Sequence, residues 1–367
     1  MPIKDLHEKP FDDSTIAKLE IFEDYAQAWI PTFVMQNVET ICIFDFFAGT
    51  GYDKNGVAGS PIRLLNKIKE QVIPIFQRKV KVKVYLNEFK AQKLELLKKA
   101  CAEYLEENDH VRRAIEIVYS NEDFEELFPK LLPIIKHFPS LVYLDQNGIR
   151  FLSEKYLLEL EKTKQTDFLY FASSSYLWRL GELKEFKTHL DIDMSKVKKE
   201  PYKFVHRSVI KQLKKKLPSN TQLKLYPFSL KKGASIYGII FGASHPRAVD
   251  KFLSIAWKRN ELNGEANFDI DDDNLKSQGL LFDNQPLTKK QAFQKNVKDK
   301  VLKKEITNNF DLFNFSLEEG HIGSHAADEI KKMKKNGEVF FEGTSPFITY
   351  EQVYKNKRKI DYTVLKK

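Results

Sequence analysis

Acidic side chains follow four apolar runs in the first half of the chain, each at the point where the run ends. They are Asp45, Glu88, Asp123 and Asp145. Short apolar runs that alternate with amphipathic stretches are typical of parallel strands, and open α/β sheets bind ligands at the carboxyl ends of such strands. Carboxylates at that edge accept hydrogen bonds from hydroxyl and amine groups. We therefore treat these four acids as candidate binding or catalytic residues.

A glycine-rich turn follows the first of these acids. In DFFAGTGYDKNGVAGSP, residues 45–61, Gly49 and Gly51 remove side chains that would block a ligand from backbone N–H groups. The turn departs from the dinucleotide fingerprint, because Lys54 stands where the third glycine is expected. The pattern predicts a cofactor loop for a phosphate-bearing or nucleoside-bearing ligand and weakens the case for NAD, with Asp45, Gly49 and Gly51 as cofactor-binding residues.

The other three acids have different expected roles. Glu88 would accept hydrogen bonds from ribose hydroxyls, and Asp123 would lie near an adenine ring. Asp123 has an equally good interpretation as the cap of the helix that begins with FEELF. Asp145 is the candidate catalytic residue: it would accept a hydrogen bond from an amine that attacks a methyl group, aligned by positioning. Its alternative role is to cap the following helix or to tighten a turn with Asn147 and Gly148.

The apolar runs predict the sheet that positions these acids. Five strands alternate with helices, and two further strands are joined only by KKGA, which is too short for a helical crossover. These two strands must pair antiparallel. Five parallel strands closed by an antiparallel hairpin predict an α/β fold, a Rossmann-like class I methyltransferase sheet that binds S-adenosylmethionine. The expected strands are residues 40–47, 82–88, 115–121, 141–146, 167–173, 221–230 and 235–244.

The remaining segments predict further parts of the molecule. Ile16, Leu19, Phe22, Tyr25 and Trp29 recur at helical spacing and predict an N-terminal packing helix. The C-terminal fifth predicts a winged-helix-like domain, with a helix–turn–helix through 324–337, wing strands at 338–343 and 347–353, and a basic tail from 354. The expected divisions are the N-terminal helix (1–35), the methyltransferase-like domain (36–262), a solvated polar linker (263–285) and the winged-helix-like domain (286–367).

Charge is concentrated in the C-terminal domain. Residues 286–367 hold 17 Lys or Arg against 11 Asp or Glu, which is +6 of the net +9 of the chain. Such a surface suits DNA or RNA as a partner, although lysines also simply solvate helical surfaces, and a winged helix can bind a protein instead. The candidate nucleic-acid-binding residues are Lys331, Lys332, Lys334, Lys335, Lys357, Arg358 and Lys359.

Patterns that are missing from the sequence indicate the compartment of the protein and whether it binds a metal. It shows no signal-peptide pattern and no apolar run of membrane-spanning length, and its two cysteines suit a reducing compartment, so a cytoplasmic protein without membrane contact is expected. No metal is expected. Asp269, Asp271 and Asp273 mimic the start of a calcium loop without its glycine and glutamate. His321 and His325 lack a third ligand, and we expect them at a solvent-facing helix start.

Several of these motifs together resemble a known family. DFFAGTG with GSP, LVYLDQNG, VHRSVIKQLKKKL and IYGIIFGASHPRAVDKFLSIAWKRN are similar to the three-Cys-motif partner family (TcmP) from about residue 15 to the linker. The resemblance implies a methyltransferase-like fold, a cofactor loop that includes Asp45, Phe47, Gly49 and Gly51, and a partner protein with a three-cysteine, radical-S-adenosylmethionine-like motif. The family usually has Asp-Pro-aromatic-Gly at the fourth strand end, where this chain has Gln146 and Asn147 after Asp145.

Two functions follow from these observations. The first is an S-adenosylmethionine-dependent methyltransferase, most simply one that N-methylates nucleic acid, in a phage-defence or mobile-element gene cassette. The second is a catalytically inactive, methyltransferase-like adaptor that binds nucleic acid and a three-Cys-motif partner, an alternative that the altered DQNG motif favours.

Overall fold

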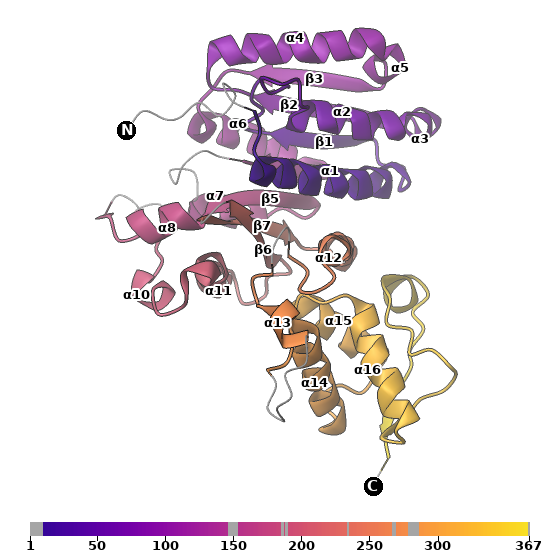
Figure 1. The fold of residues 1–367 in the computed structure, drawn as a ribbon. Helices are drawn as coiled ribbons and strands as arrows, with labels where there is room; N and C mark the ends of the chain where they lie inside the picture. The colour runs from indigo at the N-terminus through magenta and orange to yellow at the C-terminus, as the bar shows by residue number, and fades with distance from the viewer. Residues whose placement is uncertain are drawn as a thin grey trace. The chain divides into compact units, whose positions relative to one another are not determined.

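The computed structural model describes residues 10–145, 153–184, 187, 190–232, 235–265, 269–277 and 286–365. The chain divides into two compact units, Met1–Ser244 and His245–Lys367. The elements of both units are labelled in Figure 1.

The first unit is built on a seven-stranded sheet with the order β3-β2-β1-β4-β5-β7-β6. β1 pairs in parallel with β2 and β4, and β7 pairs antiparallel with both β5 and β6. This is the predicted sheet of five parallel strands closed by an antiparallel hairpin, so the expected class I methyltransferase-like fold is confirmed. The strands are β1 (Thr40–Asp45), β2 (Lys81–Asn87), β3 (Ile115–Ser120), β4 (Ser140–Leu144), β5 (Thr166–Ser173), β6 (Lys224–Lys232) and β7 (Ser235–Ala243).

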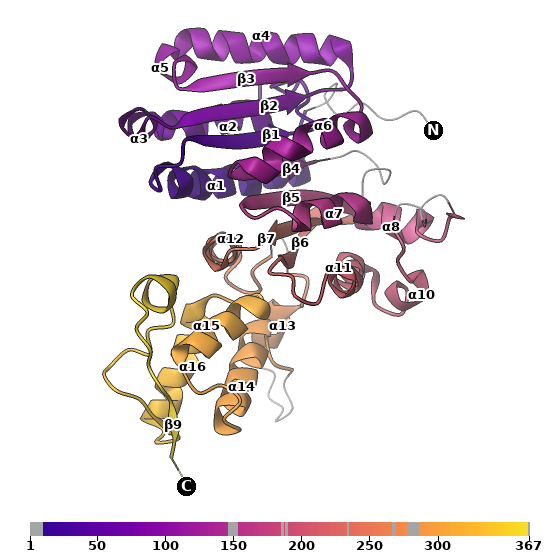
Figure 2. The same ribbon diagram turned by 180° about the vertical axis from the view of Figure 1, so that it is seen from behind.

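Helices cover both faces of this sheet. α1, α2 and α4 lie on one face in Figure 1, while α6 and α7 lie on the other, which faces the viewer in Figure 2. Burial on both faces explains why β1 and β4 are apolar without alternation. The helices are α1 (Asp13–Val34), α2 (Ser60–Glu70), α3 (Val72–Arg78), α4 (Ala91–Glu107), α5 (Asp109–Arg112), α6 (Phe124–His137), α7 (Glu154–Glu161), α8 (Ser174–Leu180), α10 (Met194–Val197), a 3-10 turn (Tyr202–Phe204) and α11 (Val205–Lys216).

Helix α1 confirms the predicted N-terminal packing helix. Asp12 caps it by accepting a hydrogen bond from the Thr15 backbone N–H at 3.0 Å. Its buried face meets the sheet through aromatic side chains: Phe22 stacks on Tyr143 of β4 with ring centroids 4.2 Å apart. The Tyr25 hydroxyl donates to Asp167 at the start of β5 over 2.7 Å. The helix is therefore fastened to the sheet by packing and by a buried hydrogen bond.

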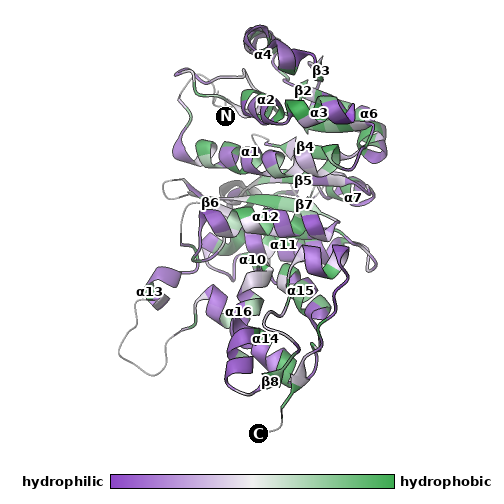
Figure 3. Ribbon diagram, turned by 90° about the vertical axis from the view of Figure 1, so that its right-hand side faces the viewer, coloured by the Kyte–Doolittle hydropathy of each residue, from purple (hydrophilic) through white to green (hydrophobic). Residues whose placement is uncertain are grey.

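The second unit contains a small helical bundle followed by a two-stranded ribbon. It starts at His245, earlier than the boundary at 262 expected from the sequence, because α12 contacts α15 and the Trp257 indole donates to the Gly320 carbonyl at 2.9 Å. Much of α14 is hydrophilic in Figure 3. The elements are α12 (Pro246–Arg259), α13 (Asp273–Ser277), α14 (Lys289–Leu302), α15 (Asn309–Glu318), α16 (Gly323–Lys335), β8 (Val339–Phe340), a π-helical turn (Glu351–Lys355) and β9 (Thr363–Val364).

The wing differs from its expected form. β8 lies in the first predicted wing strand, but its antiparallel partner is β9, within the segment predicted as a basic tail. The predicted second strand, 347–353, instead runs into the π-helical turn. The reason is local: Asn309 exchanges hydrogen bonds with the backbone of Arg358 and Ile360, and Ile360 and Tyr362 are buried. These contacts hold the C-terminal segment against α15.

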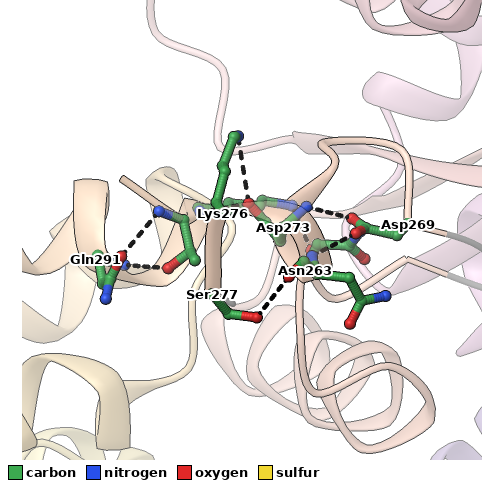
Figure 4. A network of polar contacts seen from close by, with 9 residues as sticks. Asn263, Asp269, Asp273, Lys276, Ser277 and Gln291 are labelled. Carbon is green, nitrogen blue, oxygen red and sulfur yellow. Dashed lines mark hydrogen bonds and ion pairs between the residues drawn. The ribbon is translucent and has the colours of Figure 1, made fainter. Parts of the chain in front are cut away.

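The segment expected to be a solvated linker is partly buried. Asn263, Glu265 and Asp273 are all nearly inaccessible to solvent. Figure 4 shows how Asp269 organises the segment: its carboxylate accepts from the Asn263 side chain at 3.1 Å and from the Asp273 backbone N–H at 2.8 Å. Its acids therefore serve as acceptors for the turn into α13, and residues 278–285 lie outside the described part of the chain. None of the described helices has the length and apolar character needed to cross a membrane.

Candidate functional site

The strand order brings three of the four predicted acids to one edge of the sheet. β1 is the central strand of the parallel set, and the chain passes from it first to β2 and β3 on one side and then to β4 on the other. This reversal is a topological switch point, where open α/β sheets hold ligands at the carboxyl ends of their strands. Asp45 is the last residue of β1, while Glu88 and Asp145 directly follow β2 and β4.

Asp45 is buried and receives hydrogen bonds from a hydroxyl and a backbone amide. The Ser60 hydroxyl donates to its carboxylate at 2.6 Å, and the Phe47 backbone N–H donates to the other oxygen at 3.1 Å. Burial raises the pKa of Asp45 to about 7, and the charges of Asp145 and Glu88 add to the rise, while the two hydrogen bonds oppose it. Asp145 and Glu88 therefore lie close enough to Asp45 for their charges to act on it, as expected for side chains at one edge of the sheet.

The glycine turn is a closed loop packed against α4. Gly49 and Gly51 have φ of 68° and 87°, which side chains rarely adopt. A Cβ on Gly51 would lie 2.8 Å from the Ala100 Cβ, so the second glycine is needed for close packing against α4 as well as for its backbone conformation. The loop closes where the Gly59 N–H donates to the Gly51 carbonyl at 2.7 Å. It is therefore preformed.

An asparagine that the sequence analysis did not single out connects the strand ends. Asn87 is buried, and its side-chain amide donates to the carbonyls of Phe46 and Glu122 at 3.2 and 3.0 Å. Its own backbone carbonyl accepts from Ala48 at 2.9 Å. One side chain thus ties the loops after β1 and β3 to the end of β2. In the sequence, Asn87 could have been recognised as a polar residue that stands between an apolar run and the candidate acid Glu88.

Glu88, Phe89 and Phe47 line the same edge, whereas Asp123 has a structural role. The Glu88 carboxylate is partly exposed and accepts from the Lys90 N–H at 2.9 Å. Phe89 beside it is 66% exposed, and Phe47 is half-buried with its ring 5.4 Å from that of Phe124. Asp123 caps α6 by accepting from the Glu125 N–H at 2.9 Å, which is the alternative that the sequence left open.

Asp145 forms a buried ion pair that the sequence analysis missed. The Lys18 ammonium on α1 donates to both of its carboxylate oxygens at 2.7 Å, and the two side chains are only 8% and 17% exposed. Lys18 precedes Phe22, Tyr25 and Trp29 by 4, 7 and 11 residues, so it lies on the same face of the helix as these buried rings. A charged residue at such a position could have indicated the ion pair from the sequence. Gln146, Asn147 and Gly148, the altered part of the motif, lie outside the described residues.

The candidate nucleic-acid-binding residues divide into two groups. Lys331, Lys332 and Lys335 are exposed at the end of α16, and within the described residues they form no ion pair. Lys334 instead holds the wing, since its ammonium donates to the carbonyls of Phe341 and Gly343 at 2.8 and 2.7 Å.

The basic residues of the C-terminal segment are exposed but partly engaged. Lys359 pairs with Asp361 at 2.8 Å, and the Arg358 guanidinium lies 4.0 Å from the centre of the Phe347 ring. Lys357 is exposed and takes a positive φ of 49°. The basic surface of the second unit is therefore centred on α16 and on Lys357.

The two histidines do not lie at a solvent-facing helix start. His321 and His325 are buried, with their Nδ1 atoms 3.1 Å apart and the His321 ring stacked on Phe293 at 4.0 Å. Burial lowers their pKa values to about 2 and about 4. They are neutral core residues that pack against Trp257. The described residues contain no group of three or more side chains suited to hold a metal ion.

These features define a methyltransferase-like α/β unit followed by a winged helix–turn–helix unit. Residues 269–346 match the family model described as GMT-like wHTH domain, which confirms the winged helix. No curated protein matches the chain.

Two solved structures are distantly similar to this chain. The O-methyltransferase TomG from Streptomyces achromogenes, involved in tomaymycin synthesis and crystallised in complex with SAM, is 10% identical, with a TM-score of 0.32 over 65% of this chain and 91% of that one. The DszA carbon methyltransferase is 12% identical, with a TM-score of 0.31 over 56% of this chain and 47% of that one. These likenesses are distant, and the assignment of the fold rests on the strand order itself.

Proposed function

We propose that this chain is an S-adenosylmethionine-dependent methyltransferase that acts on nucleic acid. The observation that carries the proposal is the convergence of Asp45, Glu88 and Asp145 beside a preformed glycine loop at the switch point of the sheet. In open α/β sheets this is the place where a nucleoside-bearing ligand binds.

The residues at this edge fit the cofactor. Glu88 offers a partly exposed carboxylate for ribose hydroxyls, and the exposed ring of Phe89 offers an apolar face for adenine. The acidic cluster favours a ligand with cationic groups. When bound, S-adenosylmethionine supplies an electrophilic methyl group on a sulfonium. Asp45, Phe47, Gly49, Gly51 and Glu88 would hold it, with Asp123 acting only through α6.

Asp145 would serve the acceptor. A carboxylate that accepts a hydrogen bond from an amine orients the nitrogen lone pair, which supports N-methylation. The exposed lysines of α16 would recruit DNA or RNA by neutralising phosphates. The resemblance to the three-Cys-motif partner family adds to the proposal a partner protein with a three-cysteine motif. We further propose a cytoplasmic location for this chain and a phage-defence or mobile-element setting.

The test is calorimetric titration of the purified protein with S-adenosylmethionine and S-adenosylhomocysteine. We expect micromolar binding that Glu88→Gln weakens about 10-fold or more, because a carboxylate that accepts from ribose hydroxyls is replaced by an amide. Asp123→Ala is the matched control: it removes an acid from the same edge, should leave affinity unchanged and should cost about 1 kcal/mol of stability. A folded wild-type protein that binds neither ligand would refute the proposal.

A methyltransferase-like adaptor without activity is the second candidate function. It is favoured by the ion pair between Lys18 and Asp145, which already engages both oxygens of the proposed catalytic carboxylate. Such an adaptor would bind nucleic acid and the partner protein without transferring a methyl group. Tritiated S-adenosylmethionine incubated with mixed DNA and RNA separates the two functions, because only the enzyme labels the nucleic acid.

A further inference from the structure

In the described part of the chain, Lys18 is the charged side chain of α1 whose contacts reach the candidate site. Its ammonium lies 2.7 Å from both oxygens of Asp145 and 4.1 Å from the centre of the Phe171 ring of β5. It comes from a helix on the face of the sheet, while Asp145 follows β4. The N-terminal helix therefore contributes directly to an edge otherwise built from strand ends and loops.

The surroundings of Lys18 occupy its whole ammonium group. An ammonium carries three N–H donors and no acceptor. Two N–H groups serve the two oxygens of Asp145, and the remaining side of the ammonium lies over the Phe171 ring, an arrangement that favours a cation. Lys18 has no donor left for a substrate as long as this arrangement holds. Its effect on a reaction would pass through Asp145.

The carboxylate of Asp145 is correspondingly restricted. A carboxylate has about four lone-pair positions. Within the described residues, Lys18 takes one position on each oxygen, and the Tyr143 hydroxyl takes a second on Oδ2 at 3.3 Å. The position that these contacts leave lies on Oδ1. Two partners on different elements thus fix both the rotation of the carboxylate and the oxygen that can receive a further donor.

We propose that Lys18 is a positioning residue for methyl transfer: it holds the Asp145 carboxylate so that Oδ1 receives the N–H of the acceptor amine. This inference rests on the proposed function and adds to it a residue 127 positions away from Asp145. In the transfer, the acceptor nitrogen forms a bond to the methyl carbon, the methyl–sulfur bond breaks with its electron pair going to sulfur, S-adenosylhomocysteine leaves, and the acceptor nitrogen then loses one proton to water.

A purely structural role for Lys18 can be distinguished from a positioning role by experiment, because α1 has another polar attachment to a strand of the sheet. The Tyr25 hydroxyl donates to the buried Asp167 at 2.7 Å, at the start of β5 and so at the opposite end of a strand from the site. Tyr25→Phe removes this attachment and keeps the packing of the ring. It is the matched control for variants of Lys18, since both remove one contact between α1 and a buried carboxylate.

The first measurement follows labelling of mixed DNA and RNA by tritiated S-adenosylmethionine. We expect Lys18→Met to lower kcat about 100-fold, with a change of less than about threefold in the affinity for S-adenosylhomocysteine, because the carboxylate loses its alignment. Lys18→Arg should restore at least a tenth of the activity, and Tyr25→Phe should keep it within about twofold. Full activity in Lys18→Met would overturn the inference and leave the proposed function intact. Labelling of Lys18 itself would make it the acceptor and also overturn the inference.

The second measurement needs no cofactor and no activity. Acetylation by a water-soluble succinimide ester, followed by peptide mass spectrometry, reports how accessible each amine is. We expect Lys18 to react at least 10-fold more slowly than the exposed Lys54, and Asp145→Asn to remove most of this protection while Tyr25→Phe does not. Equal reactivity of Lys18 and Lys54 in the wild type would overturn the inference. The wild type could also protect Lys18 from acetylation and yet transfer no methyl group to DNA or RNA. The ion pair would then exist, but the proposed function would be wrong, and the positioning role with it.

Discussion

At the residue scale, the site contains two carboxylates in contrasting environments. Asp45 receives hydrogen bonds from a hydroxyl and a backbone amide, and no cation pairs with it among the described residues. Asp145 lies against the Lys18 ammonium. Neighbouring acids whose surroundings differ in this way often divide the tasks of a site. Here the raised pKa of Asp45 is compatible with a place in the cofactor loop, and the ion-paired carboxylate of Asp145 is compatible with binding the methyl acceptor.

The raised pKa of Asp45 predicts how the stability of the first unit depends on pH. Its pKa is about 7 in the folded protein and near 3.8 when exposed, so between these values the folded state binds more protons than the unfolded state. The free energy of unfolding therefore falls as pH rises from about 4 to about 7. Asp45→Asn should flatten this part of the curve, because the amide has no proton to lose.

The measurement is the midpoint of urea unfolding at pH 5, 6, 7 and 8 for the wild type and Asp45→Asn. Asp167 contributes in the same direction, since burial raises its pKa to about 7, so the variant should keep part of the slope. An unchanged slope in Asp45→Asn would contradict the assignment.

At the element scale, the loop between β1 and α2 combines backbone strain with close packing. Gly51 and Gly56 both have positive φ, yet only Gly51 is confined, because a Cβ added there would lie 2.8 Å from the Cβ of Ala100. A Cβ added to Gly56 would have nothing within 4 Å. A side chain at Gly56 would therefore cost free energy of folding through its backbone conformation alone, whereas one at Gly51 would add a steric clash.

Substitution of these glycines by alanine tests that separation. Gly56→Ala should cost about 1 kcal/mol for its backbone conformation. Gly51→Ala should cost about 1–3 kcal/mol more, because the loop must move away from α4, and it should weaken cofactor binding. Thermal unfolding and calorimetric titration of both variants provide the comparison. Equal destabilisation would mean that contact with α4 does not shape the loop.

The elements also show what the sequence can and cannot predict. The parallel strands and the closing hairpin followed from apolar runs and from a connection of four residues, because both signals are local. The contact of Lys18 with Asp145 did not, since 127 residues separate them and nothing local sets how a helix lies on a sheet. β9 was missed because two residues carry no periodicity, and its position depends on Asn309. The burial of His321 likewise depends on Phe293 and Trp257, which are distant in sequence.

At the scale of the whole molecule, an acidic site and a basic winged helix share one chain. The lysines at the end of α16 also complement the helix dipole, so their number alone does not establish a contact with phosphates. A test must therefore compare variants that change the net charge of the protein by the same amount.

The triple variant Lys331→Ala, Lys332→Ala and Lys335→Ala should weaken binding to mixed DNA or RNA, measured by fluorescence anisotropy over a range of salt concentrations. For each phosphate that a lysine no longer neutralises, the slope of log affinity against log salt should fall by about 0.9 for a duplex. The control replaces three exposed lysines of the first unit, Lys69, Lys79 and Lys164, and changes the net charge equally. Equal slopes for the two variants would exclude α16 as the nucleic-acid interface.

The attachment of α1 has a consequence for the order in which the chain matures. Two of its polar anchors, Lys18 and Tyr25, meet partners that lie 127 and 142 residues further along, whereas Glu23 pairs with Arg63 of α2 only 40 residues along. A chain emerging from the ribosome in N-to-C order presents α1 long before Asp145 and Asp167 exist. Until β4 and β6 are made, the part of α1 that contacts these strands is uncovered, and until Asp145 is made Lys18 lacks its carboxylate partner. Helix α1 is thus fully seated only after most of the first unit has been made, and a nascent chain stalled before β5 would expose part of its apolar face to chaperones.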